Sequence, residues 1–72
     1  MKKVYKLEEL GCANCASKME REINKLNEIN SASINFLTQK LTVEADEELT
    51  EETLKTIQKI IKKIEPDCRL KV

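Results

Sequence analysis

Two kinds of hydrophobic periodicity alternate along this chain, and their order restricts the fold more than any other feature. Residues 4–9 alternate apolar and charged side chains, with Tyr5 and Leu7 on one face, which is typical of a half-buried strand. From Cys15 onwards the period becomes helical, and an apolar stripe runs opposite Lys18 and other charged residues. The stripe consists of Ala16, Met19, Ile23 and Leu26. The chain is therefore predicted to begin with a strand and a helix.

The second part of the chain predicts a β-hairpin and a second helix. Residues 31–36 and 41–45 alternate apolar and polar side chains, and Thr38 and Gln39 lie between them, which is typical of a hairpin. Thr50 is the expected N-cap of the helix that follows. Charges that suit the helix dipole occupy its two ends, namely Glu51, Glu52, Lys62 and Lys63. Its buried side is predicted to consist of Leu54, Ile57, Ile61 and Ile64.

The end of the chain completes the predicted topology. Pro66 ends the second helix, and Cys68, Leu70 and Val72 alternate with charged residues as in a closing strand. The resulting order βαββαβ predicts an α+β fold, the ferredoxin-like sandwich, in which two helices pack on one face of a four-stranded antiparallel sheet. We expect one domain over residues 1–72. Because the first and last strands are neighbours in this topology, the loop at residues 12–15 is predicted to lie beside residues 64–66.

Composition narrows the classes of function. The 72 residues include 13 basic and 13 acidic side chains, and this balance argues against a nucleic-acid partner. No apolar run approaches the roughly 20 residues of a membrane span, so direct membrane insertion is not expected. Residues 1–9 do not form a signal peptide, and the sequence indicates a cytoplasmic monomer.

Two cysteines three positions apart carry the chemistry. Cys12 and Cys15 flank the point where the first strand gives way to the helix, so both sulfurs can face one small ion or form one disulfide. Cys15 is expected at the helix N-terminus, where unpaired N–H groups should depress its pKa below the roughly 8.5 of a free thiol. Gly11 should let the loop open and close around an ion. The third cysteine, Cys68, falls on the inward phase of the last strand and is assigned to the core.

The predicted metal site combines Cys12, Cys15 and Glu65. The chain has no histidine, so the ligands must be sulfur and oxygen. Two thiolates suit linear Cu⁺, whereas a divalent ion prefers about four donors, and a carboxylate from Glu65 would be a third. We therefore predict one soft metal ion, with Zn²⁺ or Cd²⁺ favoured and Cu⁺ as the alternative. An alternative role for Glu65 is that of an ordinary charged residue beside a helix end.

With this motif on this topology, the chain resembles the heavy-metal-associated domain of metallochaperones and of P-type metal-transporting ATPases. The family pattern is Gly-Met-x-Cys-x-x-Cys; here Glu9 stands in place of the glycine, Leu10 holds the apolar position and Gly11 is the variable residue. Segments 12–16 and 64–67 look most like the cadmium/zinc ATPase branch. Copper members often carry Lys, Tyr or Phe where this chain has Ile64, and the zinc branch often has Asp where it has Gly11.

The resemblance implies metal binding and transfer without catalysis. The implied partner is a membrane P-type ATPase, in cis or in trans, or another metal-binding domain. The implied role is the cytosolic N-terminal domain of such a transporter, with a stand-alone Cu⁺ metallochaperone as the alternative. A thiol-disulfide oxidoreductase also places Cys-x-x-Cys at a helix N-terminus, but the usual aromatic and proline residues around that motif are missing here.

Overall fold

The computed structural model describes residues 1–71 and contains six regular elements in the predicted order. They are β1 (Lys2–Glu8), α1 (Ala13–Ile23), β2 (Ser31–Asn35), β3 (Lys40–Glu44), α2 (Glu51–Ile64) and β4 (Arg69–Lys71). Val72, predicted to belong to the closing strand, lies outside the described residues. Among the residues described, no helix is long and apolar enough to cross a lipid bilayer.

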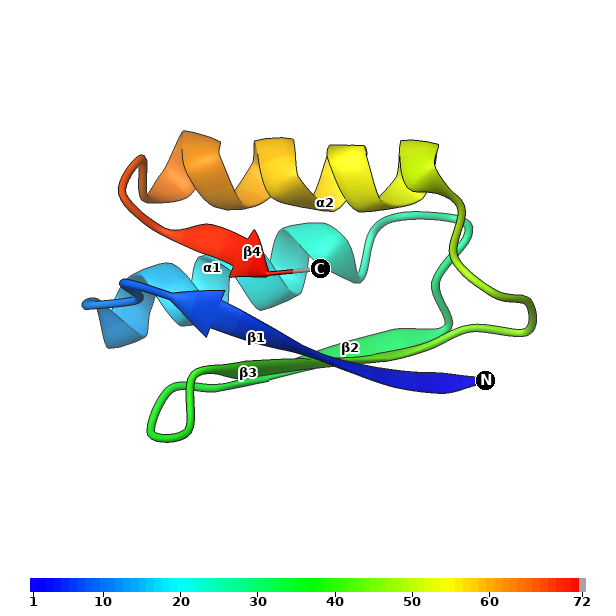
Figure 1. The fold of residues 1–72 in the computed structure, drawn as a ribbon, viewed down its shortest axis with the longest axis horizontal. Helices are drawn as coiled ribbons and strands as arrows, with labels where there is room; N and C mark the ends of the chain where they lie inside the picture. The colour runs from blue at the N-terminus through cyan, green and yellow to red at the C-terminus, as the bar shows by residue number, and fades with distance from the viewer. Residues whose placement is uncertain (72) are drawn as a thin grey trace.

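The sheet has the ferredoxin-like topology that the sequence predicts. Its strand order is β2-β3-β1-β4, and every neighbouring pair is antiparallel. Both helices lie on one side of the sheet, and the opposite side is uncovered (Figure 1). Leu7 stands opposite Leu70 in the β1–β4 register, so the end of β1 lies beside β4. This pairing brings the loop after β1 and the loop before β4 to the same end of the molecule.

Local signals set most element boundaries, but the start of α1 differs from the prediction. The Thr50 side chain accepts a hydrogen bond from the Thr53 N–H at 3.2 Å and caps α2 as expected. Helix α1 begins at Ala13 instead of Cys15, because Cys12 acts as its N-cap. The hairpin turn begins at residue 36, and Gln39 in this turn has a positive φ of 55°.

The core lies between the sheet and the two helices and matches the predicted apolar stripes. Met19, Ile23, Ile57 and Ile61 are fully buried. Cys68 is also fully buried, as predicted for a small core residue. The fold therefore separates this thiol from the cysteine pair in the loop after β1.

Candidate metal site

The cysteine loop is organised by the start of α1. Cys12 has extended backbone angles (φ −138°, ψ 115°), and its carbonyl accepts the first helical hydrogen bond from the Ala16 N–H at 3.0 Å. Its sulfur accepts a hydrogen bond from the Cys15 N–H at 3.2 Å, so it fills the position usually taken by a Ser or Asp oxygen. Both sulfurs belong to half-buried residues and neither forms a disulfide. Two free thiols are therefore held at one end of the molecule with access to solvent.

The capping geometry shifts the pKa values of the two thiols in opposite directions. A hydrogen bond from the Cys15 side chain, followed by the one from its N–H, holds the pKa of Cys12 below its usual range. The same sulfur–sulfur hydrogen bond, with burial and the neighbouring charges of Cys12 and Glu65, raises the pKa of Cys15 to about 11. The prediction that the helix N-terminus depresses the pKa of Cys15 is therefore wrong. Cys12, as the N-cap, receives the helix N–H that was assigned to Cys15.

Glu65 lies against the cysteine loop, as the topology predicts. It is the C-cap of α2, and its Oε1 accepts a hydrogen bond from the Gly11 N–H at 3.0 Å. Its second oxygen, Oε2, is buried and has no hydrogen-bond partner. A buried carboxylate oxygen without a partner is costly, so this atom is an available ligand position beside the two thiols. The negative charge of Glu65 also contributes to the raised pKa of Cys15 and, after burial, to that of Cys68.

The base of the loop contains two features that sequence reasoning missed. The Gln39 side chain donates a hydrogen bond to the Leu10 carbonyl, so the hairpin turn supports the loop from below. Leu10 itself is buried, in agreement with its assignment as the apolar residue beneath the loop. The left-handed backbone conformation lies at Glu9 (φ 62°), whereas Gly11 has no positive φ. The family pattern pointed to this conformation, because it has a glycine, the residue that adopts a positive φ most readily, where this chain has Glu9.

The predicted ligands are neighbours but do not form a finished cage. Residues 1–71 contain no group of three or more His, Cys, Asp or Glu side chains placed closely enough to hold a metal ion. Cys12, Cys15 and Glu65 therefore remain predicted ligands. Binding a divalent ion through all three would require their side chains to move.

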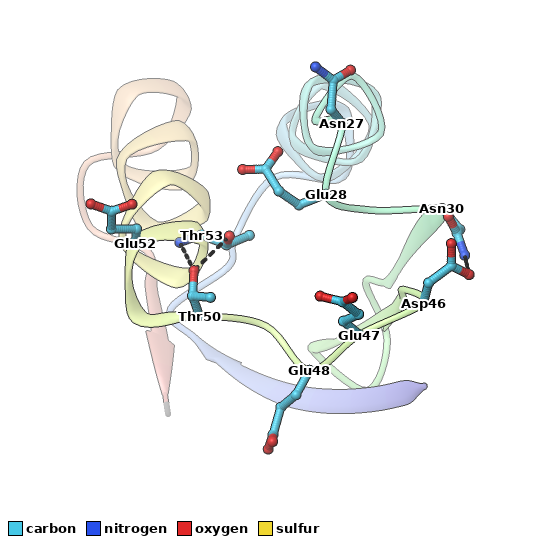
Figure 2. Close-up of a pocket in the computed structure, with 9 residues that line it drawn as sticks. All are labelled: Asn27, Glu28, Asn30, Asp46, Glu47, Glu48, Thr50, Glu52 and Thr53. Atoms are coloured by element: carbon cyan, nitrogen blue, oxygen red, sulfur yellow. Dashed lines mark hydrogen bonds between the residues drawn. The ribbon is translucent and has the colours of Figure 1, made fainter.

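A cavity of about 460 Å³ lies at the other end of the molecule and contains none of these groups. Figure 2 shows it between the α1–β2 and β3–α2 connections, with carboxylates around its mouth. Its lining comprises Asn27, Glu28, Asn30, Asp46, Glu47, Glu48, Thr50, Glu52 and Thr53. The Asn30 amide donates to Asp46 Oδ1 at 2.8 Å, and the Thr53 N–H donates to Thr50 Oγ1, so part of this polar lining is satisfied internally. The cysteine pair therefore lies outside this cavity.

A four-stranded sheet with helices on one face and an open Cys-x-x-Cys loop defines a small metal-binding module, and comparison with known proteins gives its family. The sequence model of the heavy-metal-associated domain matches residues 4–67. The chain belongs to this family. Its members bind soft metal ions as binding and delivery modules and are not catalysts.

The relatives include transporters of different metals. The cadmium, zinc and cobalt-transporting ATPase of Bacillus subtilis is 35% identical over 66 residues, which are 92% of this chain and 9% of that protein. The probable copper-importing P-type ATPase A of Enterococcus hirae is 35% identical over 49 residues, which are 68% of this chain and 7% of that protein. This chain thus spans less than a tenth of the length of either ATPase.

A solved structure confirms the fold at modest sequence identity. The apo N-terminal domain of the copper(I) ATPase PacS superposes with a TM-score of 0.74 and 26% identity. The match covers 100% of this chain and 92% of that one. The ferredoxin-like fold is therefore shared with a domain of a copper ATPase, while sequence relatives include both cadmium/zinc and copper transporters.

Proposed function

We propose that this domain binds one Zn²⁺ or Cd²⁺ ion through Cys12, Cys15 and Glu65 and transfers it by ligand exchange. The observation that carries the proposal is the Glu65 carboxylate, which has one oxygen fixed by Gly11 and a second, buried oxygen without a partner. A carboxylate beside two thiolates neutralises a divalent ion better than a monovalent one, and oxygen is a poor ligand for Cu⁺. The ligand set is incomplete for a divalent ion, which leaves a position for a ligand from a receiving protein.

The proposed receiving protein is a membrane P-type ATPase, either as part of the same polypeptide or as a separate molecule. Similarity to the cadmium, zinc and cobalt-transporting ATPase of Bacillus subtilis supports this partner. In this setting the domain works on the cytosolic side of the membrane. The positive charge of Lys18 partly offsets the rise in the pKa of Cys15, so Lys18 lies near the site. From there it is proposed to contact the surface of the receiving protein.

The alternative is a Cu⁺ carrier of the same fold, in which Cys12 and Cys15 are the two ligands. The copper-transporting relatives favour it. In that case Glu65 serves only to hold Gly11 and the cysteine loop. The two proposals therefore differ in the role of one carboxylate.

Metal competition on reduced protein tests these proposals. Cd²⁺ binding is followed by thiolate-to-metal charge-transfer absorption for wild type, Cys12→Ser, Glu65→Ala and Glu65→Gln. We expect Cys12→Ser to abolish tight binding and Glu65→Ala to weaken Cd²⁺ affinity by about tenfold or more, since loss of supporting groups at metal sites already costs roughly 10–100-fold. Glu65→Gln keeps an oxygen for the Gly11 N–H but removes the charge, so it separates ligation from loop support.

The control is Glu28→Ala, which removes the same charge from an exposed position at the other end of the molecule. Cd²⁺ affinity that survives Cys12→Ser would end the paired-thiolate proposal. Equal Cd²⁺ affinity in wild type and both Glu65 variants, with much tighter Cu⁺ binding, would favour the copper carrier.

A further inference from the structure

The uncovered face of the sheet carries a regular pattern of charges. Residues on this face alternate with the buried ones along each strand and stand opposite one another in the strand register. Lys2 faces Glu44 across β1 and β3, and Glu8 faces Arg69 across β1 and β4. Opposite charges placed in this way stabilise a sheet. The register therefore places each of these acidic side chains opposite a basic one, although neither pair forms a salt bridge within residues 1–71.

One row of the same face breaks the pattern. Lys40 of β3 stands opposite Lys6 of β1, which in turn stands opposite Lys71 of β4. All three side chains are exposed, and none takes part in a salt bridge within residues 1–71. Like charges directly opposite each other destabilise a sheet. The fold thus maintains three adjacent lysines at some cost to its own stability.

Protection of the sheet edge does not explain this row. Lysines on edge strands commonly prevent unwanted strand pairing, and this accounts for Lys71. Lys6 and Lys40, however, belong to β1 and β3, the two inner strands of the order β2-β3-β1-β4. Their repulsion therefore needs a different reason, such as an acidic group that docks on them.

An exposed apolar tip lies next to the lysine row. Leu37 is 90% exposed and Phe36 is 36% exposed in the β2–β3 turn, which leads directly into Lys40. The Asn35 side chain accepts hydrogen bonds from the N–H groups of Leu37 (2.9 Å) and Thr38 (3.2 Å), and these bonds fix the conformation of the turn. Figure 1 shows this turn curling away from the helices at the end of the molecule that bears the β1–α1 loop.

We infer that Lys6, Lys40, Lys71 and the tip Phe36–Leu37 form a docking surface for a protein partner that presents an apolar pocket rimmed with carboxylates. The pocket accepts Leu37, and the carboxylates neutralise the lysine row. This surface lies on the face opposite the helices, so a docked partner leaves the helical side of the cysteine loop free. The inference goes beyond the metal-transfer function and does not depend on the identity of the metal.

The charge count favours a protein partner over a lipid surface. Recognition of anionic membranes by basic clusters usually involves 4–8 Lys or Arg residues. On this face Lys2 and Arg69 stand opposite Glu44 and Glu8, whose negative charges offset theirs. Only the row of three lysines has no acidic side chain opposite it, which is fewer than that number. A protein surface can place carboxylates against the lysines and avoid both glutamates.

NMR titration of ¹⁵N-labelled protein tests the docking surface. The probe is a ten-residue peptide of alternating Glu and Leu, and the matched probe is alternating Lys and Leu. We expect the acidic probe to shift amides of residues 35–41, Lys6 and Lys71, and the basic probe to leave them unchanged. Lys6→Gln/Lys40→Gln should weaken binding roughly three- to tenfold, as expected for the loss of two exposed charge pairs.

Three further measurements make the test decisive. Lys55→Gln/Lys59→Gln removes the same charge from exposed positions on α2 and should leave binding unchanged. Leu37→Ser should weaken binding of the acidic probe and leave Cd²⁺ affinity as in wild type. Amide shifts confined to α1 and α2, no binding of the acidic probe, or an equal loss in the α2 variant would overturn the inference. The protein is also sedimented with phosphatidylcholine vesicles that contain one-third phosphatidylserine. If wild type sediments with these vesicles and Leu37→Ser does not, the surface binds a membrane and the inference is wrong.

Discussion

The capped cysteine loop makes a quantitative prediction about thiol reactivity. At pH 7 a thiol with a pKa of about 11, as at Cys15, is ionised in only about one molecule in ten thousand. A free thiol with a pKa of about 8.5 is ionised in about 3% of molecules at this pH, so Cys15 carries about 300-fold less thiolate than a free thiol does. The higher intrinsic nucleophilicity of a less acidic thiolate returns a factor of roughly 10–20, so Cys15 should react about 15- to 30-fold more slowly than a free thiol. The pKa of Cys12 is lowered by its hydrogen bonds from Cys15, so Cys12 should be the faster of the two thiols.

The assay is brief treatment of reduced, metal-free protein with limiting iodoacetamide, followed by peptide mass spectrometry. Both cysteines are half-buried, so access alone does not favour either one. In Cys15→Ala, Cys12 loses its main stabilising hydrogen bond and should react more slowly at pH 7. In Cys12→Ala, Cys15 loses the sulfur that raises its pKa and should react faster. Equal labelling of the two thiols in wild type, or earlier labelling of Cys15, would refute the capping argument.

Three stability predictions follow from other parts of the fold, each measured by thermal or urea unfolding. Glu9→Gly should stabilise the domain by about 1 kcal/mol, or roughly 4–8 °C in Tm, because Glu9 has a φ of 62°, which glycine adopts at no steric cost. The control Glu8→Gly lies within β1 and should destabilise the domain by about 0.5–1 kcal/mol. Lys6→Gln should stabilise the domain by a few tenths of a kcal/mol, because it removes repulsion from Lys40 and Lys71. This gain should fade in 1 M salt and should be missing in the control Lys55→Gln. Destabilisation by Lys6→Gln at low salt would contradict the repulsion argument. Cys68→Ser should cost about 1–3 kcal/mol, because a hydroxyl is buried in the core, with the number of Cd²⁺ ions bound unchanged; a loss of bound metal would return Cys68 to the site.

Much of the fold could be predicted because its signals are local and repeated. Alternating strands, apolar helix stripes and the Thr50 cap gave the element order, and the order gave the topology. The topology then placed Glu65 beside the cysteine loop, although the two are about fifty residues apart in sequence, and the hydrogen bond from Gly11 confirms this proximity. A prediction made from periodicity thus extended to one long-range contact at the candidate site.

The details that failed depend on single side chains. Ser, Thr, Asp and Asn are the usual N-caps, so nothing in the sequence marked Cys12 as the residue that begins α1. Because the helix starts earlier than predicted, the pKa of Cys12 is lowered, and that of Cys15 is raised where a lowered value was predicted. The hydrogen bond from Gln39 to Leu10 was also missed, since it joins a hairpin turn to a distant loop and has no periodic signature.

The negative charge of Glu65 affects both the ionisation of the thiols and the charge of the metal ion that the site favours. In the empty domain its negative charge opposes ionisation of Cys15, so the carboxylate disfavours a site with several negative ligands. A cation that replaces the thiol protons reverses this effect, and a divalent ion leaves less residual negative charge on the proposed ligand set than a monovalent ion does. Because the Gly11 hydrogen bond occupies only Oε1, Oε2 is left without a partner and is the oxygen proposed to bind the metal. The same carboxylate therefore favours protonated thiols in the empty domain and a divalent ion in the loaded one.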